Sequence, residues 1–445
     1  MATSLDREKT NQQRKVVAAG LIGNSVEWYE FFIYGTAASL VFNKLFFPEF
    51  DPLVGSLIAL STFAVGFVMR PIGSIVFGHF GDRAGRKSML VITLTLMGVS
   101  TFGIGLLPTY PQVGIAAPIM LVLLRLVQGF SLGGEYGGSI LMSVEHAGQR
   151  KGFFGAIVNS GVGCGLVMAT GVYLLLSALP DEQFFLWGWR IPFLVSVVLI
   201  VLGLVIRLKV EESPEFLSTE QSGEIVKTPL FQVLRRYPSL VVVMCAAYLS
   251  SGVTFYIVTV FSLSYGTQHL AIPRGRILTV LMLAIFFMIA GMIVFGWLSD
   301  RVNRKMIFQF SAIGMALAPW LWFPLLGSNN SLIMFLGFLI VLVPYSANYG
   351  VMPSFFSHVF PAHIRYTGMS LGYTLGAVLA GGLAPIIATF LLGLSGSWTY
   401  IAVYMTVVGV ISTISAAALK DYQPGGPQDS VASEKTDAAC VGKLA

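Results

Sequence analysis

Long apolar runs separated by short polar connections dominate the chain. A run of about 20 apolar residues is long enough to cross the hydrocarbon core of a bilayer as an α-helix. We therefore predict an all-α membrane protein with twelve transmembrane helices. The predicted spans lie near residues 17–42, 54–78, 88–107, 116–144, 152–178, 188–207, 239–267, 277–298, 306–326, 331–354, 367–393 and 397–419.

Composition supports this class and excludes several others. The chain is 55% hydrophobic and only 11% charged, whereas soluble domains carry about 25% charged residues. The runs are too long and too evenly apolar for transmembrane strands, which alternate over about ten residues. The three scattered cysteines indicate neither a disulfide framework nor a metal site. The five histidines fall in loops or at span ends, so a central histidine proton relay is not supported. A nucleotide-driven pump or an enzyme is not supported, because we find no phosphate-binding loop and no nucleophile motif.

The distribution of basic residues predicts the orientation. Of the 27 Lys and Arg residues, 21 fall on the side that would carry both termini, 4 fall on the other side, and Arg70 and Arg125 lie within spans. Basic residues concentrate in cytoplasmic loops, so both termini are predicted to be cytoplasmic. The net charge of +6 is spread over these short loops, so we expect no nucleic-acid partner.

The longest connection divides six predicted spans from six. It is rich in Glu, Ser, Lys and Pro, which is typical of a surface linker. The end of the chain is similarly poor in apolar residues, and we expect it to be disordered. The predicted organisation is a cytoplasmic N-terminus at 1–16, an N-terminal six-helix bundle at 17–208, a cytoplasmic linker at 209–238, a C-terminal six-helix bundle at 239–419 and a disordered cytoplasmic tail at 420–445.

The two halves share a repeated loop. The sequence GHFGDRAGRK begins at Gly78 after the second span, and GWLSDRVNRK begins at Gly296 after the eighth, 218 residues later. Parallel six-helix halves with a site at their interface are a transporter architecture. The aspartate of each loop could cap a helix or pair with an arginine and so lock the halves together in one access state; simple anchoring by basic residues would not require the repeat. The candidate gating residues are Gly78, Asp82, Arg83, Arg86, Asp300, Arg301 and Arg304.

Several motifs resemble those of known transporters. The two loops, and RLVQG from Arg125, resemble signatures of the major facilitator superfamily. Longer matches resemble its metabolite:proton symporter family: GNSVEWYEFFIYG from Gly23, RPIG from Arg70, GGEYGG from Gly133, WGWRIPF from Trp187, ESPEF from Glu212 and FPAHIRYTG from Phe360. Within that family, DEQF from Asp181, YIVT from Tyr256, SYGTQ from Ser264 and LKD from Leu419 look most like the shikimate permease branch.

This resemblance implies a proton-coupled symporter that imports a small organic acid by alternating access. It implies a multi-pass protein of the bacterial inner membrane, with the bilayer and a small acid as partners, the proton as coupling ion, no other cofactor, and a monomeric state. The family also carries dicarboxylates, α-ketoglutarate, citrate, and proline or betaine, and an aromatic acid is a further alternative. An exporting antiporter or an uncoupled facilitator of the same fold stays open. The family usually has Asp where this chain has Glu30.

Charged residues within the spans are candidates for coupling. Burying one in hydrocarbon costs at least about 2.5–3.5 kcal/mol unless it faces a partner or water. Counting helix rise places Glu30 about 20 Å and Arg125 about 18 Å above the cytoplasmic edge, so we predict that they pair. Glu30 or Glu27 would carry the proton, while Arg125 alternates between that carboxylate and an anionic substrate. Glu27 could instead make a packing hydrogen bond, Glu135 could act in packing, in gating or as a proton carrier, and Arg70 could belong to the network or clamp helices. Arg125 could instead be a structural arginine that pins helices together.

Polar and aromatic residues in other spans are candidates for binding the substrate. Small-molecule sites combine a few placed polar groups with aromatic side chains. The cluster from Pro344 to Gly350 is the strongest candidate, because proline and glycine loosen the helix where polar groups gather. For any single Tyr, interface packing is the alternative. The candidates, besides Arg125, are Tyr34, Gln128, Asn159, Tyr256, Thr259, Tyr345, Asn348, Tyr349 and Tyr373.

Overall fold

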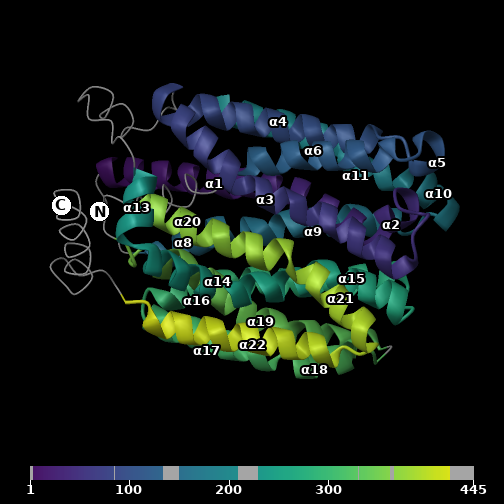
Figure 1. Ribbon diagram of the computed structural model, residues 1–445. Helices are drawn as coiled ribbons and strands as arrows, with labels where there is room; N and C mark the ends of the chain where they lie inside the picture. The colour runs from purple at the N-terminus through teal and green to yellow at the C-terminus, as the bar shows by residue number, and fades with distance from the viewer. Residues whose placement is uncertain are drawn as a thin grey trace, which may run out of the picture.

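The computed structural model describes residues 4–84, 86–133, 150–208, 229–328, 330–360 and 365–420. These residues form long helices that run side by side (Figure 1), and no β-strand occurs among them. Helix α1 begins and helix α22 ends on the left of Figure 1, which we call the terminal end. The short helices α5 and α10 lie at the other side, which we call the distal end.

The helices of the first half precede those of the second along the chain. The first half contains α1 (Ser4–Ala37), η1 (Ala38–Phe42), α2 (Asn43–Leu45), α3 (Pro52–Ala84), α4 (Arg86–Leu106), α5 (Tyr110–Val113), α6 (Ala116–Leu132), α8 (Lys151–Asn159), α9 (Gly161–Leu176), α10 (Asp181–Leu186), η2 (Gly188–Arg190) and α11 (Ile191–Leu208). The second half contains α13 (Pro229–Arg236), α14 (Pro238–Tyr256), η3 (Ile257–Phe261), α15 (Ser262–Ser264), η4 (Tyr265–His269), α16 (Arg274–Ser299), α17 (Arg304–Leu317), α18 (Pro319–Leu326), α19 (Ser331–Phe356), α20 (Arg365–Ala377), η6 (Val378–Gly382), α21 (Ala384–Ser395) and α22 (Thr399–Ala418).

These helices account for all twelve predicted spans. Within the described ranges, eight helical stretches are long and apolar enough to cross a membrane, and a ninth forms if α17 and α18, bent by 45°, are one span. Two further apolar helices are shorter, at Val91–Leu106 and Ala116–Leu132. Helix α1 is the remaining span, and its buried part contains two glutamates.

Several spans are not straight α-helices. Short π-helical segments interrupt the first, seventh and eleventh spans at η1, η3 and η6. Such segments insert an extra residue into a helical turn and frequently occur at functional sites. Segments η1 and η3 face each other across the two halves, because the Ser39 hydroxyl donates to the Val260 carbonyl oxygen at 3.0 Å.

The outer surface is apolar. Leu175, Leu394 and Phe310 are 78%, 72% and 66% exposed, and they belong to different helices around the molecule. Such a surface suits contact with lipid, whereas a soluble monomer rarely exposes extended apolar patches. Aromatic residues from both halves fill the interior instead.

The boundaries differ from the prediction at two places. Helix α1 begins at Ser4, well before the predicted start of the first span, so the polar lead-in continues the same helix. Of the predicted linker, residues 229–236 form helix α13, whereas residues 209–228 lie outside the described residues, as do residues 421–445 of the predicted tail.

Candidate substrate and proton site

Closely packed glycines make room for Arg125. A Cβ atom added at Gly129 of α6 would lie 2.2 Å from the Gly66 carbonyl oxygen of α3, so the two backbones touch. A Cβ added at Gly66 would lie 2.6 Å from Arg125 Nε. Small residues allow such close approach of helices in a membrane. The guanidinium group therefore lies across the glycine face of α3.

Neutral groups surround Arg125, which is fully buried. Its Nη1 donates to Gln128 Oε1 at 2.5 Å, and its Nη2 donates to the Phe63 carbonyl oxygen at 3.3 Å. Its Cζ lies 4.1 Å from the ring centroid of Tyr34, 4.6 Å from that of Phe31 and 5.0 Å from that of Phe63. Among the described residues, no carboxylate forms an ion pair with it.

Glu30 is equally buried but lies at the other end of a hydrogen-bonded chain. Its Oε2 is 3.0 Å from the Thr101 hydroxyl, whereas its Oε1 has no hydrogen-bond partner in the described part of the chain. Gln128 Nε2 donates to Thr101 Oγ1 at 2.8 Å and to the Glu30 main-chain oxygen at 3.4 Å. The structure therefore differs from the predicted direct Glu30–Arg125 pair: Gln128 and Thr101 lie between the two charges.

Thr101 had not been singled out from the sequence. It is a fully buried polar residue in α4, a helix that also contains Thr93, Thr95 and Ser100. A threonine in a membrane helix is common because its hydroxyl can bond to a carbonyl of its own helix. The sequence alone therefore offers no signal that separates Thr101 from an ordinary helix residue.

Arg70 and Glu27 are the other two buried charged residues among the candidates that the structure describes. Arg70 is 7% exposed, and its Cζ lies 4.6 Å from the ring centroids of both Phe31 and Phe67 and 5.6 Å from that of Trp28. Phe31 is thus within 4.6 Å of both Arg70 and Arg125. Glu27 is 5% exposed, on the same helix as Glu30. The remaining candidate acid, Glu135, lies outside the described residues.

Tyrosines of the second half approach this charged group. The ring of Tyr256 contacts Phe67 edge-on, at 5.3 Å between centroids, and also meets Phe31 and Phe63. It therefore joins the aromatic residues that surround the two arginines. The ring of Tyr345 stacks between two other rings, those of Phe255 at 5.0 Å and Tyr349 at 5.4 Å.

Three of the candidate tyrosines make contacts through their hydroxyl groups. The hydroxyl oxygens of Tyr349 and Tyr373 lie 3.3 Å apart. The Tyr34 hydroxyl donates to Thr62 Oγ1 at 2.7 Å while its ring faces Arg125. The structure thus brings most of the predicted aromatic candidates into one continuous aromatic interior.

Other candidates hold helices together. Asn348 Nδ2 donates to the Phe308 carbonyl oxygen and to Ser311 Oγ, both at 2.9 Å, and Asn348 Oδ1 accepts from Ser251. Its amide thereby links α19 to α17 and α14. Asn159 Nδ2 donates to the Tyr349 carbonyl oxygen at 2.9 Å, across the two halves. The Thr259 hydroxyl bonds within its own helix, to the Phe255 carbonyl oxygen at 2.7 Å.

At the terminal end, Asp300 joins the halves. Its carboxylate accepts from the backbone N–H groups of Gly152 at 2.7 Å and Phe153 at 3.0 Å, at the start of α8. A carboxylate there satisfies free N–H groups and meets the positive end of the helix dipole. A Cβ added at Gly152 would lie 2.4 Å from the Gly296 carbonyl oxygen, so α8 and α16 touch here.

The other candidate gating residues are described in part. The Cζ of Arg301 lies 3.8 Å from the ring centroid of Trp297, and Arg304 Nη1 lies 3.4 Å from His358 Nε2. In the first copy of the loop, α3 ends at Ala84 and α4 begins at Arg86. The side chains of that copy lie outside the described part, namely those of Asp82, Arg83 and Arg86, as does any contact of Gly78.

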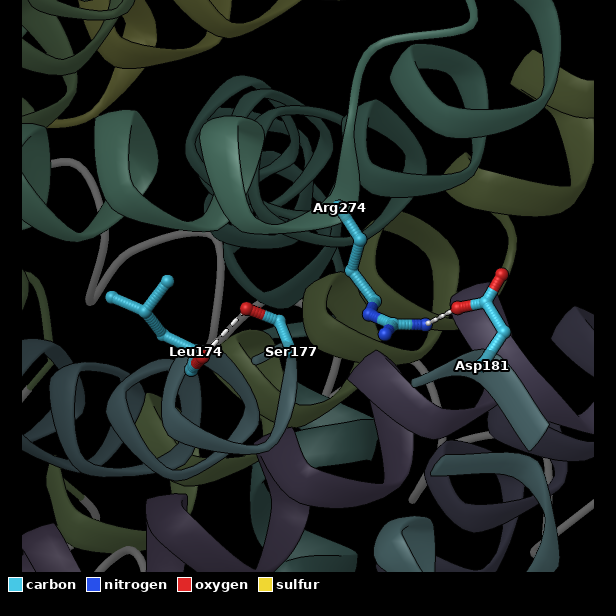
Figure 2. A network of polar contacts seen from close by, with 4 residues as sticks. All are labelled: Leu174, Ser177, Asp181 and Arg274. Carbon is cyan, nitrogen blue, oxygen red and sulfur yellow. Dashed lines mark hydrogen bonds and ion pairs between the residues drawn. The ribbon is translucent and has the colours of Figure 1, made fainter. Parts of the chain in front are cut away.

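At the distal end, an ion pair joins the halves. Figure 2 shows Arg274, at the start of α16, reaching Asp181 at the start of α10, with an Nη1–Oδ1 distance of 3.2 Å. The Cζ of Arg274 also lies 3.8 Å from the ring centroid of Phe184. The neighbouring Ser177 hydroxyl donates to its own helix, to the Leu174 carbonyl oxygen. Contacts therefore bridge the halves at both ends in this conformation.

Comparison with known proteins agrees with this architecture. The model of the Major Facilitator Superfamily matches residues 20–385, and the chain belongs to that superfamily. The structure of the D-xylose-proton symporter is 16% identical, with a TM-score of 0.72 over 91% of this chain and 96% of that chain, which shows the shared fold.

Relatives with higher identity are transporters of metabolites. The Shikimate transporter of Escherichia coli K12 is 38% identical over 419 residues, covering 93% of this chain and 96% of that protein. The inner membrane metabolite transport protein YhjE of the same strain is 40% identical over 428 residues, covering 93% and 97%. The proline/betaine transporter of that strain is 34% identical, covering 92% and 83%.

The chain is therefore a multi-pass membrane transporter rather than an enzyme. The twelve-helix major facilitator fold predicted from hydropathy and motifs is confirmed. The resemblance to the shikimate permease branch, drawn from short motifs, is likewise confirmed by the extended identity.

Proposed function

We propose that the chain is a proton-coupled symporter that imports a small hydroxylated carboxylic acid of the shikimate type. The observation that carries this proposal is that two buried ionisable side chains, those of Arg125 and Glu30, lack an ionic partner in the part of the chain that the structure describes. Arg125 has no acidic partner among the described residues, and one oxygen of Glu30 has no hydrogen-bond partner there. A buried cation with only neutral neighbours favours an incoming anion.

Arg125 is proposed to bind the substrate carboxylate. The planar guanidinium offers paired N–H groups that match the two oxygens of a carboxylate. One of these groups now bonds to the amide of Gln128, a neutral acceptor that a carboxylate can replace. Tyr34, Phe31 and Tyr256 supply aromatic surface beside it, which suits a ring-shaped acid.

Glu30 is proposed to carry the proton, with Glu27 as the alternative carrier. A carboxyl group without water favours its neutral form, whereas a nearby cation favours its ionised form. Glu30 is fully buried, and Arg125 lies two hydrogen-bonded residues away. A rearrangement during alternating access that brings Arg125 closer to Glu30 would favour release of the proton, and one that separates them would favour its binding.

Alternating access is proposed to require opening of one end at a time. Asp300 at the terminal end and the Arg274–Asp181 pair at the distal end hold the halves together now. We infer from the distribution of basic residues that the terminal end is cytoplasmic and that the protein lies in a bacterial inner membrane. We propose a monomer that needs no cofactor other than the proton.

The first test is uptake of labelled shikimate into proteoliposomes that contain the purified protein, with and without an inward proton gradient. We expect accumulation that collapses when a protonophore is added. No uptake by folded protein would reject the substrate, and a panel of dicarboxylates, aromatic acids, proline and betaine would follow. Uptake that is the same with and without the proton gradient would reject proton coupling.

Two variants test the residues. We expect Glu30→Gln to lose uphill uptake while keeping exchange of internal for external substrate, because a neutral amide cannot release a proton. Proton-driven accumulation by this variant at the wild-type level would remove Glu30 as the carrier.

We expect Arg125→Lys to lose substrate binding, because a point charge cannot reproduce the paired N–H groups. Binding of labelled shikimate to the purified variant measures this directly. Wild-type affinity in Arg125→Lys would remove Arg125 from the site.

A further inference from the structure

The Thr101 hydroxyl has three polar neighbours. It lies 3.0 Å from Glu30 Oε2, 2.8 Å from the Met97 carbonyl oxygen and 2.8 Å from Gln128 Nε2. Thr101 is fully buried, and within the described residues it is the single hydrogen-bond partner of the Glu30 carboxyl group. Thr101 belongs to α4 and contacts Glu30 of α1 and Gln128 of α6, so it lies between the proposed proton carrier and Gln128.

The number of protons at this hydroxyl limits which bonds coexist. A threonine hydroxyl donates one hydrogen and accepts two. Gln128 Nε2 is a donor, so it uses one acceptor position of Thr101 in every arrangement. The Met97 carbonyl oxygen can only accept. The single hydroxyl hydrogen must therefore go either to Met97 or to Glu30.

The choice depends on whether Glu30 carries a proton. An ionised carboxylate can only accept, so the Thr101 hydrogen must turn to Glu30 and leave Met97. A protonated carboxyl group can donate to Thr101, and the hydroxyl hydrogen then bonds to Met97. Loss of the hydrogen bond from Thr101 to the Met97 carbonyl oxygen costs little free energy, because the Ser100 hydroxyl also donates to that oxygen at 2.8 Å.

We propose that Thr101 is a positioning residue that transmits the protonation state of Glu30 through Gln128 to Arg125, so that proton binding releases Arg125 for the substrate. The proposal rests on the proposed function. When Glu30 is ionised, each group in the chain from Arg125 to Glu30 donates in the same direction, and such aligned bonds strengthen one another. Arg125 is then held on Gln128.

Protonation of Glu30 reverses the direction of the chain at Thr101. The hydroxyl oxygen now accepts from both Glu30 and Gln128, and the two donors compete for its electron density. The bond from Arg125 to Gln128 Oε1 weakens in turn. A substrate carboxylate then displaces Gln128 at lower cost, which makes the proton bind before the substrate.

Other ionisable groups surround this part of the chain and set the background against which Thr101 acts. None of them donates a hydrogen bond to the Glu30 carboxyl group in the described structure. On α1 and the helices that contact it, they include Glu27, Tyr29, Tyr34, Arg70, Arg125, Cys164 and Tyr173.

The test compares Thr101→Val, Thr101→Ser and Thr95→Val. Valine at position 101 keeps the shape and removes the hydroxyl, serine restores it, and Thr95→Val makes the same change at an exposed threonine of the same helix, whose hydroxyl bonds to the Val91 carbonyl oxygen. Binding of labelled shikimate to purified protein is measured at pH 6 and pH 8, and thermal unfolding checks that each variant is folded.

We expect wild type, Thr101→Ser and Thr95→Val to bind more tightly at the lower pH. The ratio of the dissociation constant at pH 8 to that at pH 6 should be at least about threefold smaller in Thr101→Val than in wild type. This is the effect of losing roughly one hydrogen bond. A Thr101→Val variant that keeps the wild-type ratio would overturn the proposed role of Thr101 but not the proposed proton coupling. A wild type whose binding does not depend on pH would overturn both this inference and the proposed proton coupling.

Discussion

We expect the ion pair at the distal end to hold that end closed. Arg274 and Asp181 belong to different halves, and their side chains are 15% and 79% exposed. Arg274 also packs on Phe184, which is fully buried. Replacing Arg274 by Gln removes both contacts, whereas Asp181→Asn removes only the ion pair.

The structure sets the size of the two effects. An exposed ion pair contributes about 0.2–1 kcal/mol. A cation over an aromatic ring at a partly exposed site adds about 0.5–1 kcal/mol. Arg274→Gln should therefore favour the open distal end by about 1–2 kcal/mol, a change of about 5–30-fold in the population ratio. Asp181→Asn should change the ratio by less than about fivefold.

Spin labels can measure this equilibrium. Leu186 and Leu332 lie near the distal end in different halves and are 71% and 65% exposed, so labels fit there without disturbing the interior. Pulsed electron resonance between these labels, after the native cysteines are replaced, gives the fractions with short and long separation. Glu182→Gln is the matched control, because Glu182 is an exposed acid adjacent to Asp181.

The distance distributions show whether the ion pair holds the distal end closed. If Arg274→Gln and Glu182→Gln give the same distance distribution as wild type, the ion pair does not hold the distal end, and the reasoning is wrong. The Asp181 contribution should also shrink in 1 M salt, where exposed charges are screened within about 3 Å. The contact of Arg274 with Phe184 should remain under those conditions.

Two further changes test how the helices meet. Gly129→Ala should lower the stability measured by thermal unfolding by about 1–3 kcal/mol, because its Cβ would lie 2.2 Å from the Gly66 carbonyl oxygen. Gly23→Ala is the control, because a Cβ there would have nothing within 4 Å. Equal melting temperatures of the two variants would contradict the close packing. Asp300→Asn should favour opening of the terminal end by about 0.3–1 kcal/mol, because the charge at the start of α8 is lost. Labels placed at the terminal end should report that shift, and an unchanged distribution would show that the charge does not matter.

The fold was predictable because the bilayer restricts the choices. Backbone polar groups in lipid must be satisfied within the segment, so a long apolar run becomes a helix. This holds even for α1, where the two glutamates of the buried part weaken the apolar signal. The bent pair α17–α18 was also predicted as one span, although its prolines, Pro319 and Pro324, are visible in the sequence.

The site was predictable in depth but not in detail. Helix rise gives the height of a residue along its helix, which brought Glu30 and Arg125 to the same level. It does not give the direction in which a long side chain extends. Gln128 lies three residues after Arg125, on the same helix face, and takes up its guanidinium group before Glu30 can. Asn348 illustrates the same limit, because its amide is used by neighbouring helices.

The four buried charged residues in the described ranges give a physical reason for coupling. Glu27 and Glu30, if ionised, balance Arg70 and Arg125, all of which are at most 7% exposed. A proton bound alone leaves one excess positive charge in the interior, and an anion bound alone leaves one excess negative charge. Either imbalance costs several kcal/mol in a site without water. A proton and a monoanion bound together leave the balance unchanged, so each should favour the binding of the other.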